Sequence, residues 1–257
     1  MTRMDFNLKR TEKVKWLRNA LGLIFIGISL TACALGVDRV KLYDPLTYKP
    51  VQEEGAKVAY ADVQEIKPIA GEKIKVVIKG VRDNRPDITR IGVKKNAYGM
   101  AMGSVDVEKD VVFLELFTKN LINCFELAGY EAIPIKKFEA TPTIDKEKAK
   151  AFIESEIRTF WVEFIPGFFV VDAASNVIFE IRLFEPETNR EIWSETFRGK
   201  GKVSGMAVTR AMFERSINLA YTEAMRSFYK TISDEKYSCE IMYEVTGCHH
   251  RFLSRIF

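Results

Sequence analysis

The sequence has very few of the residues that most often carry catalysis or bind metals. Among 257 residues there are two histidines and four cysteines. The histidines, His249 and His250, are adjacent and lie near the C-terminal end, where we do not expect the held geometry that a Ser-His-Asp or Cys-His arrangement needs. The chain also contains no G-x-G-x-x-G motif and no Walker-type loop. We therefore expect a protein that is not an enzyme and that holds no cofactor or metal.

The sequence also lacks an excess of charge outside its first 32 residues. The whole chain has a formal net charge of +4. Residues 1–32 contain six basic and two acidic residues, which account for all of this charge. The remainder is formally neutral, so the sequence does not favour a nucleic-acid partner. Hydrophobic residues make up 47% of the whole chain, which is enough for the core of one main domain.

The apolar run near the N-terminus is too short to cross a membrane. "ALGLIFIGISL" (residues 20–30) has 11 residues, whereas a spanning helix needs about 20. It follows a basic stretch and precedes small residues, which is the order of a secretory signal. A short buried or interfacial helix is the alternative, but it does not explain the basic flank. We predict that residues 1–32 are a signal peptide.

The end of this run carries a more specific motif. Leu30-Thr31-Ala32-Cys33 resembles the lipobox of bacterial lipoproteins. The resemblance implies diacylglycerol on the Cys33 thiol, cleavage before Cys33 and acylation of the new amino group. Several acyl chains anchor a protein durably. Since Ala34 rather than Asp follows, the resemblance also implies the outer membrane, with the mature chain facing the oxidising periplasm.

The pattern of the mature chain predicts one domain between two appendages. Residues 33–72 contain three prolines and few apolar runs, so we expect a tether that lets the domain stand away from the bilayer. Residues 73–232 alternate between strand-like and helix-like periodicities. The remaining residues, 233–257, are expected to form a C-terminal tail.

The order of elements predicts an α+β fold. A strand is expected near residues 73–81, helices near 110–128 and 208–232, and a hairpin around "EPETN" (residues 185–189). Further strands are expected at 130–135 and 151–164. The resulting β-α-β-β-β-α layout predicts a mostly antiparallel sheet with two helices packed on one face.

The stretch "GVRDNRPDITRIGVKKNAYG" (residues 80–99) concentrates charged and turn-forming residues. Its cations could bind phosphate on a lipid headgroup or glycan, because arginine suits bidentate phosphate contacts. A structured turn with internal salt bridges is the interpretation we favour, since Asp83 and Asp87 lie among the cations and Asn84 and Pro86 favour turns. The candidate anion-binding residues are Arg82, Arg85, Arg90, Lys94 and Lys95.

Three other features call for an interpretation, and two of them have alternatives. Cys239 and Cys248 could form a disulfide, join the histidines in a metal site or remain thiols; the disulfide suits the periplasm best. Cys124 falls on a helical apolar stripe, which predicts an inert core residue. Phe168 and Phe169, in "FIPGFFVVDAAS", belong either to a buried strand or to an exposed apolar tip that docks a partner or dips into a bilayer.

Several short motifs together point to a family. A lipobox, a strand running into "DNR", "IG.K.N.YG", a helix ending in "GY" and a hairpin closing on "IW" resemble the YajG-type outer-membrane lipoproteins. The layout of residues 70–230 is also similar to auxiliary lipoproteins of envelope transport complexes and to the N-terminal domain of TolB. The resemblance implies a periplasmic accessory or scaffold that binds an envelope protein. A carrier or sensor of an anionic ligand, using the 82–95 loop, is the alternative.

Overall fold

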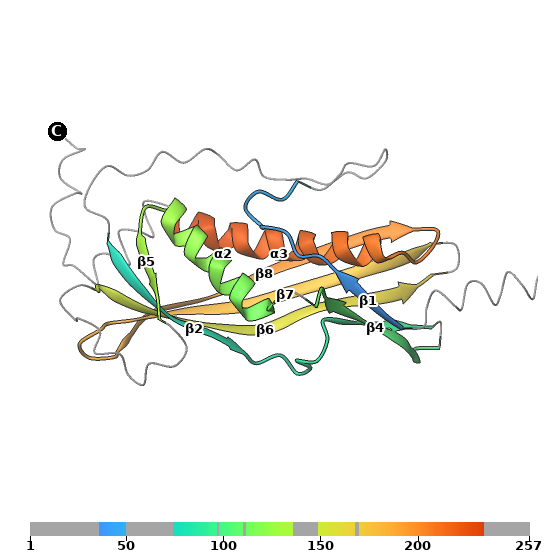
Figure 1. Ribbon diagram of the computed structural model, residues 1–257, viewed down its shortest axis with the longest axis horizontal. Coiled ribbons are helices and arrows are strands. Elements are labelled where there is room, and N and C mark those ends of the chain that lie inside the picture. Colours follow the sequence, from blue (N-terminus) through green and yellow to red (C-terminus); the bar gives the residue numbers. More distant parts are fainter. Residues whose placement is uncertain are drawn as a thin grey trace, which may run out of the picture.

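Three long antiparallel strands form the centre of the molecule. The computed structural model describes residues 36–49, 74–96, 98–109, 112–135, 149–167 and 170–233. Within them β6 (Ala151–Pro166) pairs with β7 (Val171–Phe184), which pairs with β8 (Glu191–Gly205). These strands run most of the length of the domain (Figure 1). Along β7 every second side chain is buried, as expected for a strand with one face on the core.

The remaining strands extend the sheet along the other edge of β6. β2 (Lys75–Asp83) and β3 (Gly92–Lys95) both lie parallel to β6, one after the other. The short β5 (Glu131–Pro134) is parallel to β2. β4 (Ala101–Val107) returns antiparallel to β3, and β1 (Gly36–Val40) is parallel to β4.

The prediction of a mostly antiparallel sheet in the order β-α-β-β-β-α is wrong. Among the described residues the sheet is mixed: four strand pairings are parallel and three are antiparallel. The hydrophobic period shows which face of a strand is buried, but it does not show which strand lies beside it. The prediction also missed β1, β3 and β4, which are short or rich in charged and small residues.

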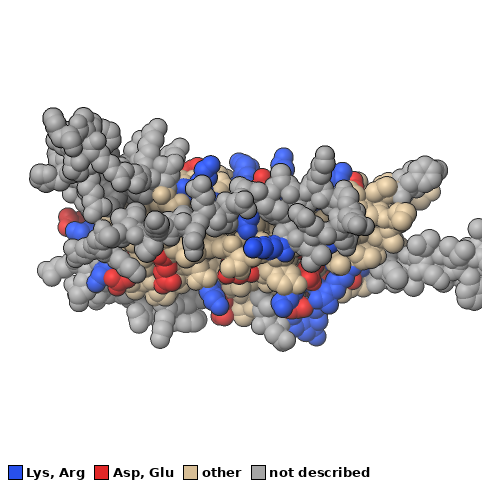
Figure 2. Space-filling view, turned by 90° about the horizontal axis from the view of Figure 1, so that it is seen from above, with Lys and Arg blue, Asp and Glu red and all other residues tan. Residues whose placement is uncertain are grey.

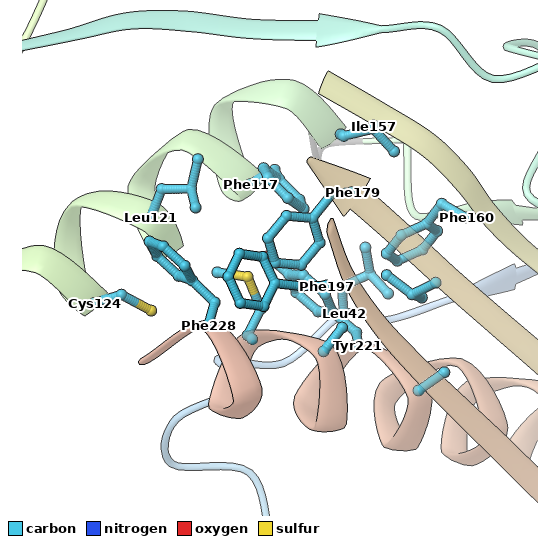
Figure 3. Close-up of a cluster of buried hydrophobic side chains, with 14 of the residues drawn as sticks. Leu42, Phe117, Leu121, Cys124, Ile157, Phe160, Phe179, Phe197, Tyr221 and Phe228 are labelled. Carbon is cyan, nitrogen blue, oxygen red and sulfur yellow. The ribbon is translucent and has the colours of Figure 1, made fainter. Parts of the chain in front are cut away.

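Both described helices cross the same face of the sheet (Figure 1). α2 (Phe113–Leu127) and α3 (Arg210–Ser233) meet where the Phe117 ring stacks on the Tyr221 ring at 5.8 Å. There the Asn120 Nδ2 donates a hydrogen bond of 2.9 Å to the Tyr221 hydroxyl. The core below them is strongly aromatic (Figure 3), with Phe160, Phe179, Phe197 and Phe228 all buried.

Two glycines let α3 lie directly on β8. A Cβ at Gly199 would be 1.9 Å from the Ala220 carbonyl oxygen, and one at Gly201 would be 2.0 Å from the Ser216 carbonyl oxygen. Both obstacles are backbone atoms, so any side chain here would push the helix off the sheet. Ser216 uses the close contact, because its hydroxyl donates toward the Gly201 carbonyl oxygen at 3.1 Å.

The opposite face of the long strands carries charged side chains. Arg158 pairs with Glu156 on its own strand and with Glu180 on β7, and Arg182 on β7 pairs with Glu156 at 3.3 Å. This ladder of cross-strand ion pairs accounts for the alternation of carboxylates with apolar residues in the sequence. It leaves the face polar and close to neutral.

The first part of the predicted tether belongs to the domain instead. Residues 36–40 form β1, and Val40, Leu42 and Leu46 are buried in the main core. The apolar residues of this segment stand singly between polar residues and have no regular spacing. The sequence pattern therefore did not indicate that they are buried. No helix among the described residues is long and apolar enough to span a membrane.

Candidate functional site

Several predicted site residues lie outside the part of the chain that the structure describes. These are Cys33, Phe168, Phe169, Cys239 and Cys248, so the roles assigned to them stay predictions. Cys124 is described and is fully buried on α2, which confirms its place in the core. Burial raises the pKa of its thiol far above the ordinary value, so it remains protonated and unreactive.

The charged stretch after β2 is an arch, and the chain does not reverse in it. β2 pairs with β6 up to Ile157, and β3 pairs with β6 from Val162 onward, in the same direction. Between them the Asn84 amide donates to the Ile157 carbonyl oxygen, and the Val162 amide donates to the Ile91 carbonyl oxygen. Residues 84–91 therefore bulge away from the edge of β6 and return to it.

Arg85 holds this arch together from the inside. Its side chain is 6% exposed, and its Nε and Nη2 each donate to the Asp83 carboxylate at 2.8 Å. The Nη1 donates to the Arg90 carbonyl oxygen at 3.4 Å, across the arch. The guanidinium also lies 4.7 Å above the ring of Phe113, the first residue of α2. Arg85 is therefore a bridge between the arch and the helix.

The other cations of the arch also have carboxylate partners. The Arg90 Nε lies 2.6 Å from Asp87 Oδ2, and the exposed Arg82 pairs with Glu154 on β6. Lys95 pairs with Glu163. The Thr89 hydroxyl and Arg90 donate to Asp87 and lower the pKa of its carboxyl to about 2.

Lys94 is the most deeply buried cation among the described residues. Its side chain is 2% exposed, and its Nζ lies 3.0 Å from Asp38 Oδ2 on β1. Lys94 thereby ties β1 to the rest of the sheet. Since all five candidate cations of residues 82–95 contact a carboxylate, an anion would compete with a protein carboxylate for each of them.

The segment after β1 is fastened to α3. Asn218 is buried: its Oδ1 accepts from the Tyr43 amide at 2.8 Å, and its Nδ2 donates to the Lys41 carbonyl oxygen at 2.8 Å. One turn earlier Glu214 accepts hydrogen bonds from the Lys41 amide and the Tyr43 hydroxyl. The hydrogen bond to Glu214 raises the pKa of Tyr43 above its ordinary value. We call residues 36–49 the strap.

Exposed apolar side chains gather at one end of the sheet. The 96–100 turn follows β3, which runs beside the last residues of β6. Val171 of β7 pairs with both Pro166 of β6 and Gly205 of β8, so the β6–β7 hairpin and the β8–α3 connection lie at this same end. The exposed apolar residues of these three connections and of the end of β6, which we call the apolar tips, are Tyr98, Met100, Ile165, Val170 and Met206.

The apolar tips are the candidate site that the sequence analysis largely missed. Tyr98 is 88% exposed and Met206 is 92% exposed. Each stands beside a glycine, Gly99 in the 96–100 turn and Gly205 at the end of β8, and that pairing of a large apolar residue with a glycine was the available signal. Only the β6–β7 connection was recognised as a possible tip. Among the described residues no group of His, Cys, Asp and Glu could hold a metal ion.

Comparisons with known proteins find several solved structures that are similar to this chain at low sequence identity. No protein-family model and no curated protein matches the sequence. A candidate neuraminyllactose-binding hemagglutinin homolog from Helicobacter pylori is 16% identical, with a TM-score of 0.48 over 80% of this chain and 98% of its own. A Xanthomonas campestris protein is 11% identical, with a TM-score of 0.42 over 64% and 87% of the two chains.

A bacterial lipoprotein is also among these structures. The lipoprotein from Neisseria meningitidis is 10% identical, with a TM-score of 0.32 over 55% of this chain and 90% of its own. Similarity at this level carries no argument about function.

Proposed function

We propose that this chain is a bacterial lipoprotein held at the outer membrane by acyl chains on Cys33. Its periplasmic domain would act as a non-catalytic accessory or scaffold of the YajG type, binding another envelope protein. The observation that carries the proposal is Leu30-Thr31-Ala32-Cys33, placed directly after an 11-residue apolar run with a basic flank. Ala34, rather than Asp, supports the outer membrane as the destination.

The use of the charged residues supports a binding role over catalysis. A catalytic acid, base or nucleophile has to reach a substrate in a held geometry. Arg85 and Lys94 are instead engaged in buried ion pairs, and the Cys124 thiol is enclosed in the core. The carrier alternative has less support, because its proposed cations already have carboxylate partners.

The mass of the mature N-terminus tests the proposal. We expect the chain purified from membranes to begin at Cys33 and to carry the mass of a diacylglycerol and an acyl group. The Cys33→Ser variant should lose this mass and leave the outer-membrane fraction. A mature chain that begins elsewhere, or an unmodified Cys33, would refute the lipoprotein assignment.

Crosslinking in intact cells tests the accessory role. We expect a protein partner that copurifies in fixed stoichiometry after detergent extraction. Matched preparations of wild-type protein and a variant with Arg82→Ala and Arg90→Ala, which changes the exposed cations and keeps the structural Arg85, separate this role from the carrier role. A bound lipid or glycan that is lost in the variant, without a protein partner, would favour the carrier and overturn the scaffold.

A further inference from the structure

We propose that the apolar tips enter the surface of the same bilayer that holds the acylated Cys33. The domain would then stand end-on against the membrane, with the tips at the boundary between headgroups and acyl chains. This inference rests on the lipid anchor of the proposed function. It replaces the expectation that a tether carries the domain away from the membrane.

The strap sets how far the anchor can be from the domain. Gly36 is paired with Gly103 of β4, and only three residue steps separate it from Cys33. Three steps of fully extended chain span about 10 Å. Met100 is equally close to Gly103 along the chain, and β1 runs parallel to β4, away from the tips. The anchored residue is therefore confined to the end of the molecule that carries the apolar tips.

The strap cannot easily release the domain from this position. β1 is paired along its length with β4, and Asp38 is tied to the buried Lys94. Beyond β1, Asn218 and Glu214 hold the next residues on α3. Extending the strap to gain distance from the membrane would break all of these contacts and expose Val40 and Leu42.

The hairpin connections at the two ends of the long strands differ in the way that a membrane contact requires, while the far end also exposes Leu127 and Ile133. The β7–β8 hairpin at the far end is made of polar residues and one proline, "EPETNR" (residues 185–190). At the near end the connections present tyrosine, methionine, isoleucine and valine to solvent. Tyrosine is favoured at membrane interfaces because its ring is apolar and its hydroxyl stays hydrated. In Figure 2 the described atoms at the right-hand end are mostly uncharged.

Charge does not oppose this orientation. Three carboxylates lie on the strand segments beside the tips, and each has a lysine partner. Asp38 pairs with Lys94, Glu163 with Lys95 and Asp172 with Lys202. An anionic headgroup layer would therefore meet no unpaired carboxylate among these three, and repulsion would be small.

Photolabelling from within the bilayer tests the orientation. The full lipidated chain is reconstituted in phosphatidylethanolamine and phosphatidylglycerol vesicles that contain a phospholipid with a diazirine in its acyl chain. After illumination, labelled peptides are identified by mass spectrometry. We expect label in residues 96–100 and 204–209 and a loss of label in the first peptide when Tyr98 and Met100 are changed to Ser. The matched control changes Glu187 and Thr188 to Ser and should leave the labelling unchanged.

The same experiment separates failure of the inference from failure of the proposed function. The mass of the N-terminal peptide shows whether Cys33 carries lipid. A lipidated protein whose label is confined to that peptide, or is equal at residues 185–190, overturns the end-on orientation alone. Tips that stay unlabelled but crosslink to a second copy or to another protein also overturn it. A protein without lipid on Cys33 overturns the proposed function first, and the inference with it.

Discussion

Arg85 should be far more important for stability than Arg82, its neighbour in the same arch. Removing Arg85 leaves the Asp83 carboxylate, which is 15% exposed, without its bidentate partner. Breaking a buried pair costs about 3–5 kcal/mol, and the residual exposure of Asp83 reduces this to about 2–3 kcal/mol for Arg85→Ala. In a domain of this size that free energy corresponds to a fall in Tm of about 4–12 °C.

Thermal unfolding followed by circular dichroism would measure this difference. The full chain carrying Cys33→Ser serves as the reference, and every variant is made in it and measured in the same detergent. Arg82→Ala is the matched control, because Arg82 is 57% exposed and Glu154 retains Lys79 as a partner. An exposed pair contributes about 0–1 kcal/mol, so the control should unfold within about 3 °C of the reference.

A double variant tests the physical reason. Changing both Asp83 and Arg85 to Ala removes the unpaired carboxylate, so its cost should be well below the sum of the two single costs. Equal losses for Arg82→Ala and Arg85→Ala, or strict additivity of the Asp83 and Arg85 changes, would refute the reasoning.

Three further predictions concern other contacts. Gly199→Ala should cost about 2–3 kcal/mol by overpacking backbone against backbone, whereas Gly205→Ala, which meets only the flexible Met212 side chain and the Ala207 carbonyl at 3.5 Å, should cost much less in the same unfolding assay. Asp38→Ala should destabilise the fold by about 3 kcal/mol because it leaves the buried Lys94 ammonium group without its carboxylate, whereas Lys94→Met should change stability by less than about 1 kcal/mol. A larger loss for Lys94→Met than for Asp38→Ala would contradict the role given to Lys94. Thr89→Ala should raise the pKa of Asp87 from about 2 toward 3.8 in an NMR titration. Because the fold lowers the pKa of Asp87, the ionised carboxylate stabilises the fold at pH values above its pKa in the unfolded chain, and this stabilisation is lost as the pH falls toward 2. An unchanged pKa in the variant would exclude the Thr89 hydroxyl as the main cause of the lowered pKa.

The sequence predicted local structure better than neighbour relations. Alternation located β2 and β6, and the turn residues 185–189 located the β7–β8 hairpin, whose strands are longer than predicted. The helical stripe placed Cys124 in the core. The mixed sheet could not be read in the same way, because β1 meets its partner β4 more than 60 residues later. Nothing in the period of either segment specifies that pairing.

The same difference between local and long-range contacts applies to the candidate site. The ion pair between Arg85 and Asp83 is local, so interleaved charges indicated it. The pair between Lys94 and Asp38 joins residues 56 positions apart, and the apolar tips come from three separate connections. Only the folded chain brings these groups together, so composition and spacing could not identify them.

The strap also sets an order of events for an exported chain. Its hydrogen-bond partners on α3 lie 171 to 178 residues later in the sequence. Residues 36–49 would therefore reach the periplasm first and wait for nearly the whole domain to follow. For the lipoprotein proposed above, folding would not hide the processing site before Cys33 during this delay, so the peptidase and acyltransferases would meet an unfolded substrate. Completion of the last helix would then close the domain over a junction that has already been modified.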